Sequence, residues 1–418
     1  MIYDAIVVGA GLAGSLSANL LTRGGYQVAL VDKDKVPPIE FRAEQVFGEQ
    51  VHVLERLGLL DGLVRGASFT NHTIIGRRGR CLEEVDVPHY FLSYSHMVAN
   101  ARSSVPLACE CVVDRVATIE TDSTSKSVQH VRLVSGSSLK SRLVILATGL
   151  SRALHPALGI GRERVGATDS LAIGFCMTGP KLSGSMLVYS GEKTRDRVDY
   201  ISIFPWGDRL RANLFLFKDV REPWVQEFRF CPRDKLLEVM PRLSRLLGNF
   251  EIEKRVQVRT NHLWRATNHL RDGVVLIGDA FQTPCPAAGV GISRLLVDVD
   301  RLCTVHFPRW IEREGFSSPS IANFYLDPVK AASDASAIAA AEFRRNTSAN
   351  PSLSWTLYRE TASFYRRLRN TYRHRVNLPR QGEAFGTTNK IRSEVFDQLA
   401  LQKHNISVNT RIEDAAKL

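Results

Sequence analysis

The sequence lacks the features that mark membrane, secreted and metal-binding proteins. It contains no run of about 18 apolar residues, so no segment is predicted to span a membrane. The seven cysteines include no CxxC pair, and "CEC" at 109–111 is expected to alternate across a strand without zinc-ligand spacing, so no metal site is predicted. An apolar strand pattern begins at Ile2, which leaves no basic start for a signal peptide. With an odd cysteine count, this is typical of a cytoplasmic protein with reduced thiols.

The composition is that of a globular protein with excess positive charge. Apolar residues make up 44% and charged residues 23% of 418 residues, which excludes wholesale disorder and suffices for two or three domains. The formal net charge is +12, and the segment Arg359–Arg380 alone holds seven arginines against one glutamate. We interpret this segment as a solvated helix face. Peripheral contact with an anionic ligand or an acidic membrane surface is the alternative.

The clearest local pattern is a βαβ unit in residues 3–34. An apolar strand is followed by "GAGLAG" at 9–14, a helix and a second strand that ends at Asp32. Gly9 permits a tight turn, Gly11 lets backbone N–H groups approach a pyrophosphate, and Gly14 lets the helix lie close to the strand. The helix N-terminus attracts phosphate, and Asp32 can accept hydrogen bonds from a ribose diol while repelling the 2′-phosphate of NADP. The unit predicts a dinucleotide site.

A second irregular stretch is "VVLIGDAFQTPCPAAGVGIS" at 274–293. Its apolar start predicts a buried strand that puts Asp279 at the carboxyl edge of a sheet, where open α/β sheets bind ligands. A carboxylate there needs donors, so a hydroxyl-rich ligand or backbone N–H groups should meet it. Gly289 and Gly291 permit close approach of the backbone. We interpret Cys285, between two prolines, as a small buried filler, and a redox or substrate-binding thiol is the alternative.

The remaining patterns predict a sheet and then helices. Alternating apolar residues at 71–92 and 170–220 indicate antiparallel strands, and the chain after residue 294 is helical in pattern. A helix is also expected near 95–104. The predicted domains are a discontinuous nucleotide-binding domain (1–70, 93–170 and 265–312), a substrate domain (71–92 and 171–264) and a helical C-terminal region (313–418).

These motifs together resemble the flavoprotein monooxygenases of the p-hydroxybenzoate hydroxylase type, which are related to flavin-dependent halogenases and geranylgeranyl reductases. The resemblance covers roughly residues 1–310 and rests on "GAGLAG" with Asp32, Arg42 with the "LGL" helix after it, "LVILATG" at 143–149, and "GDAFQTPCPAAGVGIS". It implies an α/β fold: a Rossmann-like FAD-binding domain, an inserted antiparallel-sheet substrate domain and a helical C-terminal region.

The resemblance implies FAD as cofactor. The first motif would bind its ADP half, the Gly-Asp pair its ribityl chain, and the Pro-x-x-Gly-x-Gly backbone would lie beside the isoalloxazine ring. The residues that the resemblance assigns to FAD are Gly9, Gly11, Ala13, Gly14, Asp32, Arg42, Val116, Asp279, Gly289 and Gly291.

The sequence also departs from the family. Phe281 and Gln282 replace a common Ala-His pair, Tyr94 replaces an arginine or glutamine, and Ser293 replaces an asparagine. Thr148 precedes a glycine where enzymes that use NADPH directly tend to have Asp-Gly. NADPH or NADH is therefore expected as the electron donor either directly or through a partner flavin reductase.

The activity that the resemblance implies is hydroxylation of a small aromatic or polyketide-like substrate through a flavin C4a-hydroperoxide. An FAD-dependent reductase or dehydrogenase acting on an isoprenoid or lipid is the alternative. A halogenase is a weaker one, because "YISIFPWGDRL" at 200–210 lacks the Trp-x-Trp-x-Ile-Pro signature.

Two further hypotheses concern individual side chains. No catalytic base is assigned, and structural roles are favoured for the candidates His72, His89, Tyr200 and Arg211. Nucleic-acid binding is not expected, although aromatic residues interleave with the C-terminal arginines. We expect those aromatic residues to pack in the core, because they share one helical stripe: Trp355, Tyr358, Ala362, Tyr365 and Tyr372.

Overall fold

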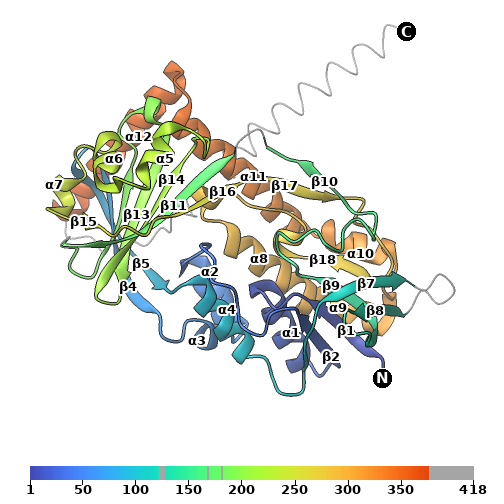
Figure 1. The fold of residues 1–418 in the computed structure, drawn as a ribbon. Coiled ribbons are helices and arrows are strands. Elements are labelled where there is room, and N and C mark those ends of the chain that lie inside the picture. The colour runs from blue at the N-terminus through green and yellow to red at the C-terminus, as the bar shows by residue number, and fades with distance from the viewer. Residues whose placement is uncertain (122–127, 167–168, 180–181, 376–418) are drawn as a thin grey trace, which may run out of the picture.

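Two sheets, with helices packed on them, organise the molecule. The structure is a computed structural model that describes residues 1–121, 128–166, 169–179 and 182–375. Within these ranges, a seven-stranded sheet lies at one end and a nine-stranded sheet at the other (Figure 1). This architecture confirms the predicted α/β fold class. The domain boundaries drawn from the sequence stay a prediction.

The seven-stranded sheet is built around the N-terminal βαβ unit. β1 pairs in parallel with β2 and β9, and β9 pairs in parallel with β18. β6 adds a parallel strand beside β2, whereas β8 and β7 continue the sheet as antiparallel strands. The carboxyl ends of the parallel strands therefore meet at one edge. The strands are β1 (Tyr3–Val8), β2 (Val28–Asp32), β6 (Glu110–Val113), β7 (Val116–Thr121), β8 (Gln129–Leu133), β9 (Ser138–Leu146) and β18 (Val274–Leu276).

Helices on this sheet form one apolar core with it. α1 (Leu12–Arg23) is buried along most of its length, and Gly24 follows its last residue as the C-cap. The helix expected near 95–104 is α4, which Ser93 caps by accepting a hydrogen bond from the His96 N–H. The helices of this core, besides α1, are α2 (Glu49–Arg56), α3 (Leu60–Leu63), α4 (Tyr94–Ser103), α8 (Gly291–Asp300), α9 (Phe307–Arg309) and α10 (Ser318–Tyr325).

The nine-stranded sheet is mainly antiparallel. The pattern of 170–220 forms β11, β12, β13 and β14, and the pattern of 71–92 forms β4 and β5, which join them through a parallel β12–β4 pair. Alternate residues of each strand point to opposite faces. One face packs on α5, α6 and α7, and the other turns toward α11 and the loop before α8. β15 and β16 pair with β11, and β3 pairs with β5.

The bounds of these elements are β3 (Gln45–Phe47), β4 (Ser68–Arg77), β5 (Arg80–Phe91), β11 (Ser170–Thr178), β12 (Met186–Ser190), β13 (Val198–Trp206), β14 (Arg209–Leu216), β15 (Glu251–Ile252), β16 (Gln257–Asn261), α5 (Pro223–Phe228), α6 (Pro232–Val239) and α7 (Ser244–Leu247). Pro241 lies between α6 and α7, where its ring disfavours continued helix. The short strand β3 was not predicted.

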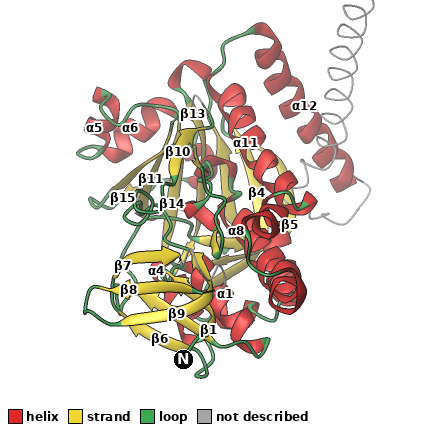
Figure 2. Cartoon of the chain, turned by 90° about the vertical axis from the view of Figure 1, so that its right-hand side faces the viewer, coloured by secondary structure: helices red, strands yellow, loops and turns green. Residues whose placement is uncertain are grey.

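One long helix, α11, and a small sheet lie between the two ends, and a second long helix, α12, packs on the nine-stranded sheet. β10 (Gly161–Arg164) pairs with β17 (Trp264–Thr267). α11 (Pro328–Ala349) contacts both α8 and β13, and α12 (Leu353–Arg375) lies along β5 (Figure 2). Asp327 caps α11 by accepting hydrogen bonds from the N–H groups of Val329 and Lys330. α11 thus ties the edge of the first sheet to the wall of the second.

The side-chain pattern of α12 departs from two predictions. The aromatic stripe packs only at its start, where Trp355 and Tyr358 contact Phe343 of α11, whereas Tyr365 is 64% and Tyr372 60% exposed. The arginines of the same helix instead face the protein: Arg359 donates to the backbone carbonyl of Asn350 at 2.9 Å, and Arg369 pairs with buried Glu83. The solvated-arginine interpretation is therefore wrong for these two positions. The predicted anionic or membrane contact stays a prediction, and its end at Arg380 lies outside the described residues.

In the described part of the chain, no helix is long and apolar enough to cross a membrane, and no three His, Cys, Asp or Glu side chains form a group that could hold a metal ion. Cys109 is buried just before β6, and Cys111 is exposed within it. Glu110 between them is exposed as well, so the predicted alternation of "CEC" across a strand is not seen.

Candidate active site

A cavity of about 840 Å³ lies between the two sheets. Its lining includes the Gly-rich loop after β1, the end of β2 and the loop before α8 on one side. On the other side it includes Ala172, Tyr200 and Phe215 from β11, β13 and β14. The carboxyl edge of a parallel sheet thus faces the inner face of a second sheet across one cavity, the usual place for a ligand in such folds.

The Gly-rich loop packs as its glycines require. A Cβ atom on Gly14 would lie 1.9 Å from the backbone oxygen of Gly9, so only glycine lets α1 lie this close to the loop. Gly11 differs, because the nearest atom to a Cβ there would be Tyr94 Oη at 3.9 Å. Gly11 lines the cavity and leaves room for a ligand beside the N-terminus of α1, whose first N–H groups have no partner within the helix.

Asp32 lies at the end of β2 and joins the first loop to the next one. Its carboxylate accepts hydrogen bonds from the N–H groups of Ala10 at 2.6 Å and Asp34 at 2.8 Å. Arg102 of α4 lies 3.3 Å from the same carboxylate and donates to the carbonyl oxygens of Ala10 and Asp34, both at 2.7 Å. Arg102 was not predicted from the sequence, and it holds both loops in place.

Arg42 brings the two motifs of the sequence together. Its guanidinium lies 3.2 Å from Asp279, is hydrogen-bonded to Glu40, and stacks over the Tyr94 ring at 5.3 Å. Burial opposes the charge of Arg42, but Tyr94, Asp279 and Glu40 outweigh it and raise the pKa. Burial raises the pKa of the Tyr94 hydroxyl, which stays neutral. Tyr94 therefore packs against the Arg42 guanidinium through the face of its ring.

The loop between β18 and α8 presents backbone to the cavity. Pro284, Pro286, Gly289 and Gly291 line it. Cys285 does not: it is buried, its thiol lies 3.3 Å from the Ser170 hydroxyl, and burial raises its pKa. This geometry favours the filler role over a reactive thiol.

The sequence-predicted residues come together with one exception. Gly14 lies beneath the loop, packed against Gly9, rather than on the cavity surface. Their contact with FAD stays a prediction, and the residues that line the cavity are Gly9, Gly11, Ala13, Asp32, Arg42, Val116, Asp279, Gly289 and Gly291.

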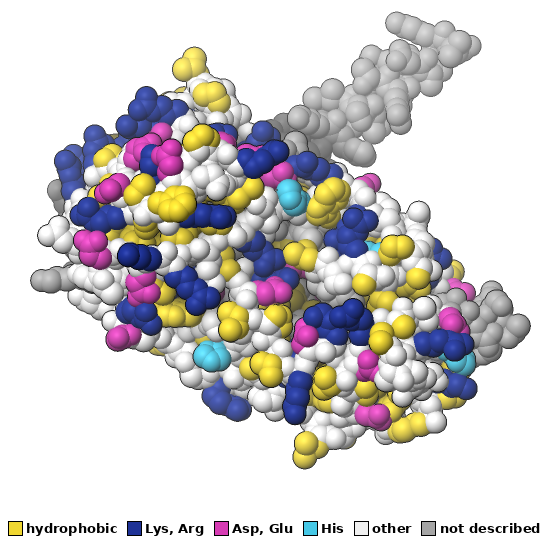
Figure 3. Space-filling view, viewed as in Figure 1, with side chains coloured by type: hydrophobic (Ala, Val, Ile, Leu, Met, Phe, Trp, Pro, Cys, Tyr) yellow, Lys and Arg dark blue, Asp and Glu magenta, His cyan; other side chains and the backbone are white. Residues whose placement is uncertain are grey.

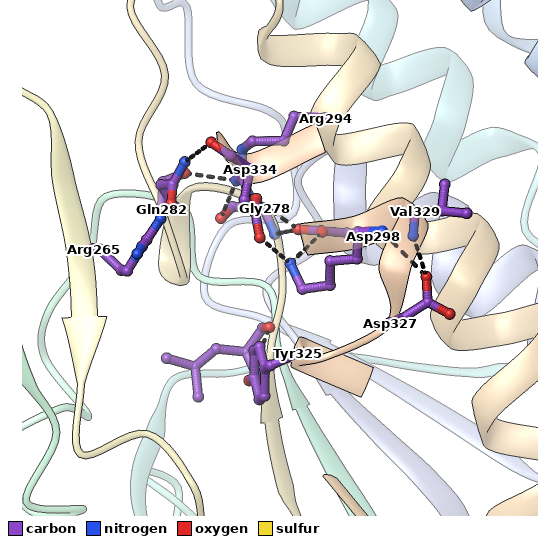
Figure 4. Close-up of polar contacts among 11 residues, drawn as sticks. Arg265, Gly278, Gln282, Arg294, Asp298, Tyr325, Asp327, Val329 and Asp334 are labelled. Atoms are coloured by element: carbon purple, nitrogen blue, oxygen red, sulfur yellow. Dashed lines mark hydrogen bonds and ion pairs between the residues drawn. The ribbon is translucent and has the colours of Figure 1, made fainter. Parts of the chain in front are cut away.

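A buried ionic network holds the loop that carries Asp279 (Figure 4). Arg294 of α8 donates to the carbonyl oxygens of Gly278 and Gln282, both at 2.6 Å, and to Asp334 of α11 at 2.7 Å. Asp298 accepts from the Gly278 N–H at 2.8 Å. The loop backbone is therefore fixed from two helices at once.

Lys330 closes this network. Its ammonium group is fully buried, 2.7 Å from Asp298 and 3.0 Å from Asp334. It also lies 4.4 Å from the centre of the Phe281 ring, a cation–π distance. Phe281 thus packs beneath the loop, where it contacts Lys330 rather than the cavity.

Gln282 has a structural role as well. It accepts a hydrogen bond from Arg265 at 2.8 Å and donates one to the Asp334 backbone oxygen at 3.1 Å. The two departures from the family at positions 281 and 282 therefore belong to the support of the loop.

The other candidate side chains divide by position. His72 lies 2.8 Å from Ser185 and 3.2 Å from Glu84, away from the cavity lining. His89 is buried within an aromatic row between Phe47 and Phe91, and burial lowers its pKa to about 4. Both have structural surroundings. Tyr200 lines the cavity and Arg211 forms a buried ion pair beside it, with Glu44 at 2.9 Å.

Sequence reasoning also missed two arginines of the cavity. Arg162 of β10 and Arg259 of β16 line it near Arg42 and Asp279. Burial lowers the pKa of both, and Asp279 opposes the shift in each. Isolated arginines in separate strands form no motif, so only the fold could bring them together. Their charge suits a ligand with phosphate groups.

The donors and acceptors present fit FAD. The open side of Gly11 at the α1 N-terminus and the arginines suit a pyrophosphate, and the acids Asp32 and Asp279 suit the ribose and ribityl hydroxyls. A comparison with families of known sequences agrees, because residues 2–304 match the model of a family described as "FAD binding domain". The chain belongs to this family. It is a flavin-dependent oxidoreductase.

Solved structures of the same fold include enzymes of more than one activity. The p-nitrophenol 4-monooxygenase PnpA from Pseudomonas putida DLL-E4 has a TM-score of 0.69 at 16% identity, covering 93% of this chain and 96% of that one. The flavin-dependent brominase Bmp2 has a TM-score of 0.64 at 16% sequence identity, and the match covers 91% of each chain. PqsL, a probable FAD-dependent monooxygenase from Pseudomonas aeruginosa, has a TM-score of 0.63 at 16% sequence identity. The match covers 87% of this chain and 100% of PqsL. A search of curated protein sequences finds no match.

Proposed function

We propose that this flavin-dependent oxidoreductase is a monooxygenase that hydroxylates a small aromatic or polyketide-like compound. One observation carries the proposal: the cavity that suits FAD continues, past the Pro286–Gly291 loop, to the apolar walls Ala172, Tyr200 and Phe215. A flat apolar molecule would fit against these side chains, next to the loop expected to border the flavin ring.

In this proposal the protein positions both reactants and excludes water. Bound FAD supplies the activation of oxygen. Arg42 and Asp279 would hold the cofactor's polar chain, the Pro286–Gly291 backbone would lie beside its ring, and the second sheet would cover the substrate. A dry cavity matters because water would divert the oxidising equivalents.

Oxygen-18 labelling tests the proposal. Purified protein should show the visible absorption of oxidised flavin, and turnover under oxygen-18 gas should place labelled oxygen in the product. A colourless protein that cannot take up FAD would overturn the proposal at its base. Product without labelled oxygen would favour the reductase or dehydrogenase alternative over oxygenation.

A halogenase is the second candidate, and the similarity to brominase Bmp2 is the observation that favours it. The absence of the Trp-x-Trp-x-Ile-Pro signature from 200–210 weighs against it. Adding bromide to the labelled reaction and finding brominated product by mass spectrometry would decide for this candidate.

The electron donor is a further part of the proposal. NADPH or NADH would reduce the flavin directly, or a separate flavin reductase would supply reduced flavin. Thr148 lines the cavity where Asp-Gly is frequent among enzymes that use NADPH directly, which favours the reductase. Anaerobic mixing with NADPH, with and without added flavin reductase, should bleach the flavin band rapidly only when the reductase is present.

A further inference from the structure

The outward side of α12 is apolar, although it lies at the surface. α12 packs on β5 and runs along the outside of the molecule (Figure 2). At about 100° per residue, its exposed apolar side chains fall within roughly 120° of the helix circumference. These residues, here called the outer face, are 56% to 88% exposed: Leu353, Leu357, Phe364, Tyr365, Leu368 and Tyr372. Between Leu353 and Tyr372 the sequence places no charged residue in this sector.

The charged side of the same helix is the one that faces the protein. Arg359 donates to the Asn350 carbonyl oxygen at 2.9 Å, and Arg369 pairs with buried Glu83. A surface helix normally buries its apolar side and turns its charged side to water. α12 has the opposite arrangement, so its docking on β5 leaves a continuous apolar surface that the described residues do not cover. Soluble proteins keep such a surface for contact with another segment or molecule.

The chain itself supplies a segment that can cover the outer face. α12 ends at Arg375, and the sequence continues beyond the described residues. In "KIRSEVFDQLALQK" at 390–403, Ile391, Val395 and Leu399 recur at helical spacing. This pattern predicts a short amphipathic helix with one apolar stripe. Isolated helices of this length are marginal in water, so the predicted helix needs a surface on which to bury its stripe.

The connection between the two stretches allows them to lie side by side. Residues 376–389 include one proline and two glycines, which favour a turn over a continued helix. These 14 residues can span up to about 46 Å, whereas the outer face from Leu353 to Tyr372 is about 29 Å long. A segment tethered in this way has an effective concentration on the order of 1 mM at its target, higher than a free partner normally reaches.

We propose that residues 390–403 form a helix that packs its apolar stripe on the outer face of α12, so that the two helices make an antiparallel hairpin. Arg367 borders the outer face and Glu394 borders the stripe of the segment, so an ion pair can form at the rim of the contact. The inference goes beyond the proposed oxygenation and does not depend on it. It gives the C-terminal segment a role, which is to bury a surface through which the protein would otherwise self-associate.

Hydrogen exchange of the full-length protein, read by mass spectrometry, tests the inference. The amides of 390–403 should exchange at least about 10-fold more slowly in the protein than in a synthetic peptide of the same sequence. This protection should not change when the protein is diluted about 100-fold, because the contact lies within one chain. Replacing Phe364 and Leu368 together by serine should restore the exchange rate of the peptide, and the core is spared because both side chains are exposed.

Two single variants within the segment provide the matched comparison. Leu399→Ser removes a side chain from the apolar stripe and should abolish the protection. Leu401→Ser makes the same chemical change about 120° away from the centre of the stripe and should keep the protection. Both variants lower the helix propensity equally, so propensity cannot explain a difference between them.

Absence of protection in wild type would overturn the inference, as would protection that survives in the double variant at Phe364 and Leu368. Protection that fades on dilution would assign the outer face to a second copy of the chain. Wild-type protein that sediments with vesicles of phosphatidylglycerol and phosphatidylcholine, together with a double variant that does not, would assign it to a membrane surface. Either of these two results would also overturn the hairpin.

Discussion

Gly11 and Gly14 are glycines for different reasons, although they belong to one motif. At position 14 the fold itself leaves no space, because a methyl group would meet the Gly9 backbone oxygen at 1.9 Å. At position 11 the fold leaves space, and the nearest atom would be Tyr94 Oη at 3.9 Å. The first glycine is needed by the protein alone, and the second by what lies in the cavity.

Alanine substitutions should separate these two requirements. Gly11→Ala should unfold within about 2 °C of wild type when free of flavin, since its methyl group meets no backbone, but should bind FAD at least about 10-fold more weakly. Gly14→Ala should lose thermal stability even without flavin. Thermal melts and FAD titrations of both apoproteins measure this. Normal FAD affinity in Gly11→Ala would show that no ligand approaches Gly11.

Asp279 supplies the second test at this scale. Its carboxylate faces the cavity beside Arg42, and as an acceptor for ribityl hydroxyls it would form charge-assisted hydrogen bonds. Asp279→Asn should therefore weaken FAD binding about 10- to 100-fold, as measured by flavin fluorescence titration. Asp219→Asn, at a surface pair with Arg221, is the control and should bind FAD as wild type does. Equal affinity in both variants would remove Asp279 from the FAD site.

At the scale of elements, α8 and α11 position the cavity loop through charge as well as packing. Arg294 and Lys330 form buried ion pairs with Asp298 and Asp334. The backbone of Gly278 belongs to the same network, since its N–H donates to Asp298 and its carbonyl oxygen accepts from Arg294. Such groups stay charged in the interior only because each has partners. The network makes the loop conformation depend on how two helices dock.

Removing one cation should expose this dependence. Lys330→Met leaves the two carboxylates of Asp298 and Asp334 with one buried cation, Arg294, instead of two. The variant should lose about 3–5 kcal/mol of unfolding free energy, measured by denaturant unfolding. Lys235→Met breaks surface pairs with Glu227 and Glu238 and should change stability far less. Similar losses in the two variants would contradict the proposed role of the buried network.

At the scale of the whole molecule, the two signs of charge lie side by side on the face seen in Figure 3. There, Lys and Arg side chains are interspersed with Asp and Glu. Several arginines of the C-terminal helix are used inside the protein, as at Glu83. The +12 balance therefore predicts good solubility more directly than it predicts an acidic partner.

Acid should weaken the fold because burial lowers the pKa of His89, His155 and His269. Burial lowers the pKa of His89 from 6.5 to about 4, and burial with Arg162 and Arg152 does the same for His155. Between these values the unfolded chain binds more protons than the folded one, so stability falls as the pH drops from about 6.5 to 4. The expected loss is about 2 kcal/mol per histidine at about pH 5.

His89→Phe should remove the His89 share of that loss, about 2 kcal/mol, since phenylalanine continues the Phe47–His89–Phe91 row without a titrating group. Denaturant unfolding at about pH 7 and pH 5 compares the variant with wild type. An unchanged pH dependence of the unfolding free energy in the variant would mean that His89 does not contribute to the loss of stability in acid.

The sequence by itself determined the elements whose signals are local. The first 34 residues predict a strand, a turn, a helix and a ligand-binding sheet edge, through Gly9, Gly11, Gly14 and Asp32. These signals are local because glycine geometry and helix capping act over a few residues. The pattern of 274–293 likewise predicted the cavity loop before α8, and the alternation of 170–220 predicted strands of the nine-stranded sheet.

Tertiary structure alone decided what depends on distance in space. It brought Arg102, Arg162 and Arg259 to the cavity, and it turned Arg359 and Arg369 of α12 toward the protein while leaving Tyr365 and Tyr372 exposed. A helical stripe reveals that two faces differ, but which face is buried depends on the partner it meets. The same holds for Glu44 and Asn213, which lie far apart in the chain and are hydrogen-bonded only because the fold brings them together.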